Sequence, residues 1–264
     1  MNYPNIDPTL FSLGPLHVRW YGLMYVVGFV IANYLLKVLV RKGFFKVTEQ
    51  KIDSLITHML ICMFIGARFF YVFIYNWDYY SQNLGDLLAV WKGGLSFHGA
   101  LVGLVVGGII FARKNNISWL QVLDSVSLAG TPGLFFGRMG NFINGELFGR
   151  ITDSPVGMIF PDGGPYPRHP SQLYEAFLEG LLLTLILWFI MKKSKTYGVV
   201  SACFLIGYGF FRYIVEFFRE ADAQLGYYFG GTTTMGQILC LLMIFAGCGL
   251  LVFVLKSKQR LLRS

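Results

Sequence analysis

The stretch Met235–Leu255, "MGQILCLLMIFAGCGLLVFVL", carries no charged side chain. A helix needs about 20 apolar residues to cross the hydrocarbon core of a bilayer, so this stretch predicts a transmembrane helix. The 264-residue chain shares this character, because 55% of its residues are hydrophobic and only 14% are charged. Soluble domains average about 25% charged residues. The composition therefore predicts a polytopic integral membrane protein.

Six more apolar segments are long enough to cross a bilayer, so the sequence predicts an all-α fold with seven transmembrane helices. The chain shows no internal repeat and no low-complexity linker. We therefore expect residues 1–264 to form a single membrane-embedded domain, with a polar loop region at about residues 137–175. The six segments are Trp20–Val40, Leu55–Tyr75, Leu95–Ala112, Leu120–Phe136, Ala176–Met191 and Val199–Phe217.

Most of the 22 lysine and arginine residues lie in alternate loops between these segments. The positive-inside rule makes such loops cytoplasmic, which places the N-terminus outside and the C-terminus inside. Membrane orientation also accounts for the net charge of +8, so this charge indicates no nucleic-acid partner. The basic loops surround Lys42, Arg113, Lys193 and Lys258.

The polar motif "GRMGNFINGELFGR", Gly137–Arg150, directly follows an apolar segment. Arg138 and Asn141 are three residues apart and Glu146 and Arg150 four apart, so each pair shares a face where the backbone is helical. The four glycines argue against an unbroken helix and permit tight turns. A membrane-embedded arginine needs a partner. One interpretation is an Arg–Glu pair that holds a re-entrant loop; the other is an anion site in which Arg138 and Asn141 bind phosphate.

The sixth predicted span ends in a second polar motif, "GYGFFRYIVEFFRE". Its helical spacing places Tyr208, Arg212, Glu216 and Arg219 on one face, which must point into the protein rather than at lipid. The three charged residues could form a self-neutralising ladder between helices. The hydroxyl of Tyr208 favours the alternative, a buried polar cavity.

The segment "GGLSFHGALVGLVVGG" places Gly99, Gly103 and Gly107 at intervals of four, which predicts a seam for close helix packing. His98 stands at its outer end. A lone histidine at such a position can be structural, or it can accept a proton from a thiol or hydroxyl group near neutral pH. The four histidines lack metal-ligand spacing, so we expect no metal.

A fourth motif, "YPRHPSQLYEA" (Tyr166–Ala176), brackets Arg168 and His169 with prolines before the predicted fifth span. Ser171 is a candidate N-cap for that helix. The motif can be read as a capped helix start or as a loop ordered over the polar cavity.

Together these motifs resemble the prolipoprotein diacylglyceryl transferase family of bacterial inner membranes, and the fourteen-residue motif is similar to the family signature. The resemblance covers nearly the whole chain, from "WYGLMY" (Trp20–Tyr25) to "MGQI" (Met235–Ile238). It implies transfer of the sn-1,2-diacylglyceryl group of phosphatidylglycerol to the lipobox cysteine of a preprolipoprotein. A thioether forms and glycerol 1-phosphate leaves, in the first step of lipoprotein maturation.

The resemblance also implies seven spans, a periplasmic N-terminus and an active site that faces the periplasm. The expected partners are phosphatidylglycerol, the preprolipoprotein signal peptide and membrane lipids, with no cofactor. By resemblance, Arg138 and Arg212 neutralise the phosphate, His98 is the general base, and Tyr208 orients or relays. The implied substrate-binding residues are Tyr21, Asn141, Glu146, Gly149, Glu216 and Arg219.

One departure from the family pattern and three alternative interpretations accompany this resemblance. Ala100 stands where many family members have glycine, a small departure beside the glycine seam. An arginine-rich site alone could supply enough thiolate, because a thiol pKa is about 8.5 in water. A transporter or flippase for an anionic solute or lipid would also bury arginines, although the chain shows no inverted repeat. A scaffold protein would explain the glycine seam but not the polar stripe.

Overall fold

The computed structural model describes residues 1–4, 6–14, 16–89, 91, 93–220, 227–228 and 233–257. Lys258, in the last of the predicted basic loops, lies outside these residues. The regular secondary structure of the described chain is helical apart from short two-stranded hairpins and isolated bridges, and a long irregular loop joins α5 (Trp119–Ile143) to α6 (Ser171–Glu175). It forms two compact units, one of Met1–Leu35 with Val126–Ser264 and the other of Leu36–Ser125. Each unit is described by itself.

Five helices are long and apolar enough to cross a membrane, which identifies a polytopic membrane protein. They are Trp20–Arg41, Gln50–Tyr75, Phe97–Lys114, Ser171–Lys193 and Met235–Lys256. A sixth apolar helix, Val199–Val215, is shorter. These helices coincide with six of the seven predicted spans to within a few residues.

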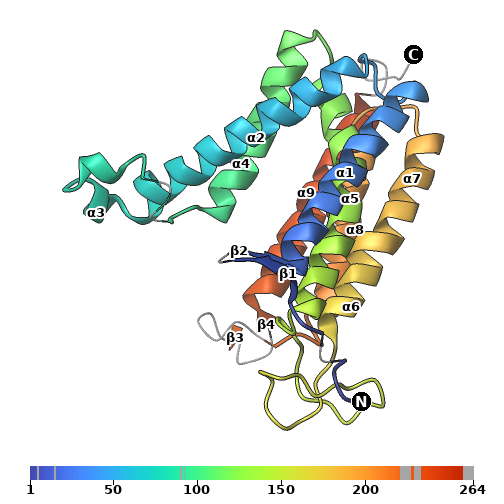
Figure 1. Cartoon of the computed structure of the whole chain (residues 1–264). Helices are drawn as coiled ribbons and strands as arrows, with labels where there is room; N and C mark the ends of the chain where they lie inside the picture. Colours follow the sequence, from blue (N-terminus) through green and yellow to red (C-terminus); the bar gives the residue numbers. More distant parts are fainter. Residues whose placement is uncertain are drawn as a thin grey trace. The chain divides into compact units, whose positions relative to one another are not determined.

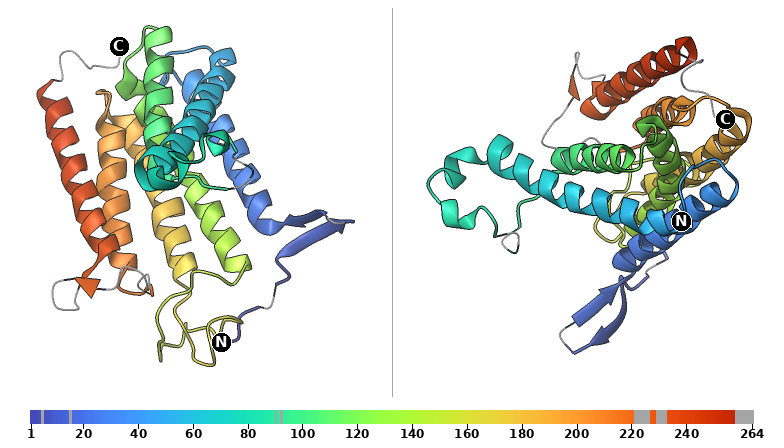
Figure 2. Two further views of the ribbon diagram at one scale, coloured as in Figure 1. Left: turned by 90° about the vertical axis from the view of Figure 1, so that its left-hand side faces the viewer. Right: turned by 90° about the horizontal axis from the view of Figure 1, so that it is seen from above.

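The first unit contains most of α1 (Trp20–Arg41) and α5 (Trp119–Ile143), together with α8 (Val199–Val215) and α9 (Met235–Lys256). The predicted fifth span is one continuous segment of three parts: α6 (Ser171–Glu175), the π-helix η4 (Ala176–Leu182) and α7 (Leu183–Lys193). In Figures 1 and 2, α8 lies between α9 and this segment.

Glycine lets the helices of the first unit approach closely. A Cβ atom at Gly28 of α1 would lie 3.2 Å from Gly133 Cα of α5. A Cβ atom at Gly209 of α8 would lie 2.9 Å from the carbonyl oxygen of Cys240 in α9. Such contacts are typical of membrane helices, where small residues permit van der Waals packing between backbones.

The second unit is built on α2 (Gln50–Phe70), its π-helical continuation η1 (Tyr71–Tyr75) and α4 (Phe97–Lys114). Short helices α3 (Trp77–Tyr80) and η2 (Leu84–Asp86) lie between them. The predicted glycine seam is confirmed, because a Cβ atom at Gly107 would lie 2.7 Å from the His58 carbonyl oxygen in α2. Ser96 caps α4 by accepting a hydrogen bond from the Gly99 backbone N–H.

Two antiparallel hairpins complete the described elements. Strands β1 (Thr9–Leu13) and β2 (Leu16–Arg19) precede α1, with an irregular register between Thr9 and Phe11. Strands β3 (Tyr227–Tyr228) and β4 (Thr233–Thr234) precede α9, whose N-terminus has a capping box made by Thr234 and Gln237.

The N-terminus anchors the loop that follows α5. The amino group of Met1 donates to the Gly157 carbonyl oxygen at 2.7 Å, and the Tyr3 hydroxyl lies 2.7 Å from the Phe142 carbonyl oxygen. Tyr3, Phe142 and Phe160 form a small buried core. Burial raises the pKa of Tyr3, which keeps its hydroxyl protonated as a donor.

The expectation that glycines interrupt the signature motif is only partly right. The helix α5 continues to Ile143, seven residues beyond the predicted end at Phe136, and contains Gly137 and Gly140. Gly140 faces α1, where a Cβ atom would come within 3.0 Å of the Tyr21 ring. The chain turns only at Gly145, whose φ of 68° favours glycine.

The N-cap prediction for Ser171 is wrong. The N-cap position of α6 is Pro170, and Ser171 is the first helical residue. Its hydroxyl donates to the Leu147 carbonyl oxygen at 3.1 Å. The side chain therefore fastens the helix to the signature loop instead of capping its own N–H groups.

Candidate active site

Three arginines from separate parts of the first unit converge on one buried carboxylate. Glu175 Oε2 lies 2.7 Å from Arg138 Nε of α5 and 2.6 Å from Arg212 Nη1 of α8. Its Oε1 lies 3.1 Å from Arg219 Nη1. Glu175 is fully buried, whereas the Arg138 side chain is 23% exposed. Arg138 is thus the arginine of this group most open to a ligand.

Glu216 forms a second carboxylate bridge between two of these arginines. Its Oε1 lies 2.8 Å from Arg212 Nη2 and 3.4 Å from Arg219 Nε. Its Oε2 accepts a hydrogen bond from the Thr234 hydroxyl at 3.0 Å. We call Arg138, Arg212 and Arg219, with the glutamates they contact, the arginine cluster.

Arg212, Glu216 and Arg219 do lie together, as the predicted helical stripe requires. The prediction that all three belong to one helix is wrong. The helix α8 ends at Val215, so Glu216 is the C-cap and Arg219 lies beyond the helix. Arg219 forms an isolated antiparallel bridge with Gly149. Since the chain leaves the helix, Arg219 reaches Glu175 from this bridge and not from a continuous helical face.

Gly149 is packed so closely against neighbouring backbone that any side chain at this position would displace it. Its N–H donates to the His169 carbonyl oxygen at 2.8 Å. A Cβ atom there would overlap the Phe218 carbonyl oxygen and lie 2.9 Å from His169 Cβ. The final glycine of the signature motif therefore sets the position of the chain that carries Arg219.

The other polar residues of the signature motif form a hydrogen-bonded chain beside Arg138. Arg138 Nη1 donates to Asn141 Oδ1 at 3.4 Å, and Asn141 Nδ2 donates to Glu146 Oε1 at 2.9 Å. Asn144 donates to the same Glu146 oxygen at 3.1 Å. Arg138 does form an Arg–Glu pair, but its carboxylate partner is Glu175, outside the motif.

Glu146 and Arg150 do not share a helical face, because both follow the end of α5. Arg150 Nε donates to the Arg219 carbonyl oxygen at 2.6 Å. The Glu146 carbonyl oxygen accepts a hydrogen bond from Gln172 Nε2 at 2.6 Å. These contacts tie the signature loop to α6 and to the end of α8.

The two predicted tyrosines flank the cluster on their own helices. Tyr21, on α1, packs against Gly140, and its hydroxyl lies 2.9 Å from that of Tyr25. Tyr208, one turn before Arg212 on α8, stacks on Phe204 with ring centroids 5.8 Å apart.

Sequence reasoning missed Glu175 and Glu179. Glu179 is also fully buried, and its Oε1 lies 3.7 Å from Arg212 Nη1. Neither of its oxygens has a hydrogen-bond partner among the described residues. A usable signal existed, because two glutamates four residues apart in an apolar span must face the protein interior and need cationic partners.

His98 lies in the second unit, at the start of α4. Its Nδ1 atom is 2.8 Å from the hydroxyl of Tyr75, a partner that the sequence did not reveal. The side chain of His98 is exposed. If Nδ1 carries the proton and donates to Tyr75, Nε2 is free to accept another proton.

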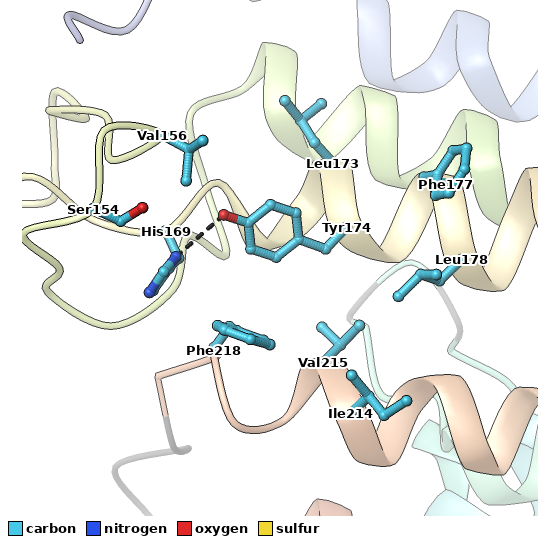
Figure 3. A pocket seen from close by; sticks show the side chains of 10 residues that line it. All are labelled: Ser154, Val156, His169, Leu173, Tyr174, Phe177, Leu178, Ile214, Val215 and Phe218. Atoms are coloured by element: carbon cyan, nitrogen blue, oxygen red, sulfur yellow. Dashed lines mark hydrogen bonds between the residues drawn. The ribbon is translucent and has the colours of Figure 1, made fainter.

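A separate apolar cavity of about 500 Å³ lies between the α6–η4 segment and the end of α8. Figure 3 shows His169 and Tyr174 joined by a hydrogen bond at one end, with Phe177 and Phe218 along the walls. None of the predicted site residues lines this cavity. Burial lowers the pKa of His169, which favours its neutral form.

This geometry supports binding of an anion with several oxygen atoms. Guanidinium groups match phosphate through paired N–H donors, and burial strengthens the interaction. Within the described residues, no group of three or more histidine, cysteine, aspartate or glutamate side chains could hold a metal ion.

Comparison with known proteins identifies the family of this chain. The sequence model of the prolipoprotein diacylglyceryl transferase family matches residues 8–253. The chain is 46% identical to the protein named phosphatidylglycerol–prolipoprotein diacylglyceryl transferase from Oleidesulfovibrio alaskensis, over 98% of this chain and 97% of that protein. Similarly named proteins are 47% identical in Aliivibrio salmonicida, over 98% and 91%, and 48% identical in Vibrio campbellii, over 97% and 93%.

Proposed function

Because this chain belongs to the prolipoprotein diacylglyceryl transferase family, we propose that it transfers the sn-1,2-diacylglyceryl group of phosphatidylglycerol to the lipobox cysteine of preprolipoproteins. It is a transferase of lipoprotein biosynthesis and catalyses the first step of lipoprotein maturation. The observation that carries the proposal for the site is the convergence of Arg138, Arg212 and Arg219 within one buried cluster.

The reaction exchanges one bond to the glycerol carbon of the lipid for another. The cysteine sulfur forms a bond to this carbon as the carbon–oxygen bond to the phosphate breaks. Glycerol 1-phosphate leaves, and the thiol proton is taken up by a base and finally by the phosphate or water. Negative charge builds on the phosphate during this step, so arginine donors that strengthen in the transition state lower the barrier.

Arg138 is the primary phosphate ligand in this proposal. Its ion pair and hydrogen bond with described residues use Nε and Nη1, which leaves Nη2 for a phosphate oxygen. Arg212 is held between carboxylates and supplies positive potential from a fixed position. Tyr21, Asn141, Glu146, Gly149, Glu216 and Arg219 are the remaining substrate-binding residues of the proposal.

His98 is the proposed general base for the incoming thiol, and Tyr208 orients a reacting group or relays the proton. The hydrogen bond between Tyr75 and His98 supports this role, because it orients the ring and leaves Nε2 able to accept a proton when Nδ1–H donates to Tyr75. No enzyme cysteine is required, since the peptide substrate brings the nucleophile.

We place residues 1–264 in the bacterial inner membrane as a single catalytic domain with seven spans. The 25 residues of α5, at about 1.5 Å each, are long enough to cross a hydrocarbon core of about 30 Å. Basic residues in alternate loops support a periplasmic N-terminus and a cytoplasmic C-terminus. The polar region at about residues 137–175 then faces the periplasm, where secreted prolipoproteins arrive.

The test uses purified protein, both in detergent and reconstituted in vesicles, with phosphatidylglycerol labelled in its acyl chains and a synthetic lipobox peptide. We expect label on the peptide cysteine and release of glycerol phosphate. A peptide with serine in place of the cysteine must remain unlabelled. If labelled lipid crosses vesicle bilayers without reaching the peptide, the chain is instead a transporter or flippase, and the proposed function is wrong.

A further inference from the structure

Glu175 is the common partner of the arginine cluster. It contacts a different arginine from each of three chain segments: Arg138 from α5, Arg212 from α8 and Arg219 from the bridge beyond α8. Both carboxylate oxygens take part. Removing this one side chain would therefore take one contact from each of the three guanidinium groups.

The electrostatics explain why the carboxylate is needed. Three guanidinium groups brought close together repel one another, and removal from water increases this repulsion. A buried carboxylate is equally unfavourable alone, but it is stabilised by several charge-assisted hydrogen bonds. Glu175 is fully buried and has three cationic neighbours, so the anion and the cations hold one another in place.

The contact atoms indicate a further consequence for Arg138. Glu175 Oε2 lies 2.7 Å from Arg138 Nε, and this ion pair holds the Nε side of the guanidinium group. Of the two outer nitrogens, Nη1 donates to Asn141 Oδ1 at 3.4 Å. A carboxylate at Nε thus leaves the end of the guanidinium group formed by Nη1 and Nη2 available to a phosphate.

The fold fixes Glu175 through the helix that follows it. The π-helix η4 begins at Ala176, and its glycine, Gly180, lies against α5 with no room for a side chain. A Cβ atom at Gly180 would lie 2.5 Å from Phe135 Cβ. This contact holds the segment close to α5 one turn before Arg138. π-Helical turns often occur at functional sites, where they reposition a side chain.

We propose that Glu175 is a positioning residue, which fixes the spacing and orientation of Arg138, Arg212 and Arg219 for the phosphate of the lipid. The role rests on the proposed function, because it acts through the arginines that bind this phosphate. Glu175 itself does not touch the reacting atoms.

The test compares Glu175→Gln, which removes the charge at constant size, with Glu175→Asp, which keeps the charge on a shorter side chain. A misplacement of about 1 Å can lower a rate by about 100-fold, and we expect a loss of this order in kcat for Glu175→Gln. The KM for phosphatidylglycerol should stay constant or fall, because the variant loses a negative charge near an anionic substrate. Glu175→Asp should recover part of kcat.

Glu49→Gln is the matched control, since Glu49 forms an exposed ion pair with Arg41 far from the cluster in sequence. It should keep wild-type kcat and KM. A merely structural role for Glu175 would reduce the amount of folded protein and leave kcat per folded molecule unchanged. That result, or a wild-type kcat in Glu175→Gln, would overturn the proposal.

A second measurement is independent of activity. Arg212 Nη1 donates to Glu175 Oε2 at 2.6 Å. In protein labelled with ¹⁵N-arginine, hydrogen exchange at the guanidinium group of Arg212 should therefore be slow in the wild type and at least about tenfold faster in Glu175→Gln. If wild-type protein transfers no lipid but shows this change, the proposed function fails and the positioning of the arginine cluster by Glu175 stands. If it transfers lipid and exchange is unchanged in the variant, the positioning role fails and the function stands.

Discussion

The Nε atom of Arg138 lies 2.7 Å from Oε2 of Glu175, so the first cation of the signature motif is paired outside the motif. Arg212 Nη1 contacts the same oxygen at 2.6 Å. The two arginines that we assign to the phosphate are therefore held by a single carboxylate atom, and any change to one of them alters the electrostatic surroundings of the other.

We expect Arg138→Ala and Arg212→Ala each to lower transfer by at least about 100-fold, the usual cost of removing one donor to a developing negative charge. The two should differ in stability. Arg212→Ala leaves Glu175, Glu179 and Glu216 without their common cation, so its Tm should fall further than that of Arg138→Ala.

Thermal unfolding and labelled-lipid transfer measured on the same preparations check both statements. Arg41→Ala serves as the control, because Arg41 pairs with exposed Glu49. Near-normal turnover by Arg138→Ala would refute its assignment as the phosphate ligand.

The base role of His98 predicts a specific effect of Tyr75→Phe. The Tyr75 hydroxyl lies 2.8 Å from His98 Nδ1, and its loss removes the hydrogen bond that orients the imidazole ring. We expect kcat to fall about tenfold, which corresponds to one hydrogen bond of about 1.4 kcal/mol. His98→Gln should lose about 100-fold or more.

Labelled-lipid transfer by both variants, compared with the wild type, checks these losses. Tyr79→Phe is the control, since the Tyr79 hydroxyl bonds to Asp86 instead. A wild-type kcat in His98→Gln argues against His98 as the base.

Gly149→Ala tests whether the signature glycine positions the strand of Arg219. The new methyl group would overlap the Phe218 carbonyl oxygen, so the bridge between Gly149 and Arg219 must open. We expect a loss of stability of about 1–3 kcal/mol, as for other overpacked sites, together with loss of transfer.

Gly137→Ala, in the same motif, is the control for the effect of Gly149→Ala on stability. A Cβ atom at Gly137 meets nothing within 4 Å, and the residue lies inside α5. Alanine there should maintain or raise the Tm, because glycine is the poorer helix former. Equal Tm values for the two variants would show that Gly149 is not held as tightly as the structure indicates.

The sequence predicted the helices and the polar residues of the site better than the contacts between those residues. Apolar length alone located the helices, and the spacing of Arg212, Glu216 and Arg219 indicated a common interior face. The carboxylate that joins them was not predictable by spacing, because Glu175 belongs to another segment and meets Arg138 only through tertiary packing. The end of α5 was misjudged for a related reason. Glycine is unfavourable in an isolated helix, but at Gly140 it permits the contact with Tyr21.

The pH dependence of stability should include a contribution from His169. Its burial lowers the pKa below the ordinary value of 6.5, so the unfolded chain binds a proton more readily than the folded chain. Stability rises with pH wherever the unfolded state binds more protons. The full contribution is therefore present above about pH 6.5 and is lost as the pH falls through the folded pKa.

We expect the Tm of the wild type to fall between about pH 7.5 and pH 5, and this fall to be smaller in His169→Gln. His17→Gln provides a comparison, because His17 is exposed on β2. An identical fall in wild type and His169→Gln would mean that other groups account for the acid sensitivity.

Arg68 is a buried cation whose hydrogen bonds, among the described residues, go to backbone carbonyl groups and not to a carboxylate. Its guanidinium group donates to the carbonyl oxygens of Leu87, Asp86, Gly93 and Gly94, at distances of 2.7–3.0 Å. It also lies over the ring of Tyr80, 5.2 Å from the centroid. A lysine cannot reproduce this planar fork, since it offers its donors from one nitrogen.

We therefore expect Arg68→Lys to lose at least about 3 kcal/mol of stability, the equivalent of two hydrogen bonds from a charged donor. Limited proteolysis should cut the loop at Leu87–Gly94 faster in the variant, while α2 and α4 stay protected by their glycine seam. Arg113→Lys, at the exposed end of α4, should leave the cleavage rate unchanged. Because four carbonyl groups lose their donor together, an unchanged rate in Arg68→Lys would show that the loop is ordered by other contacts.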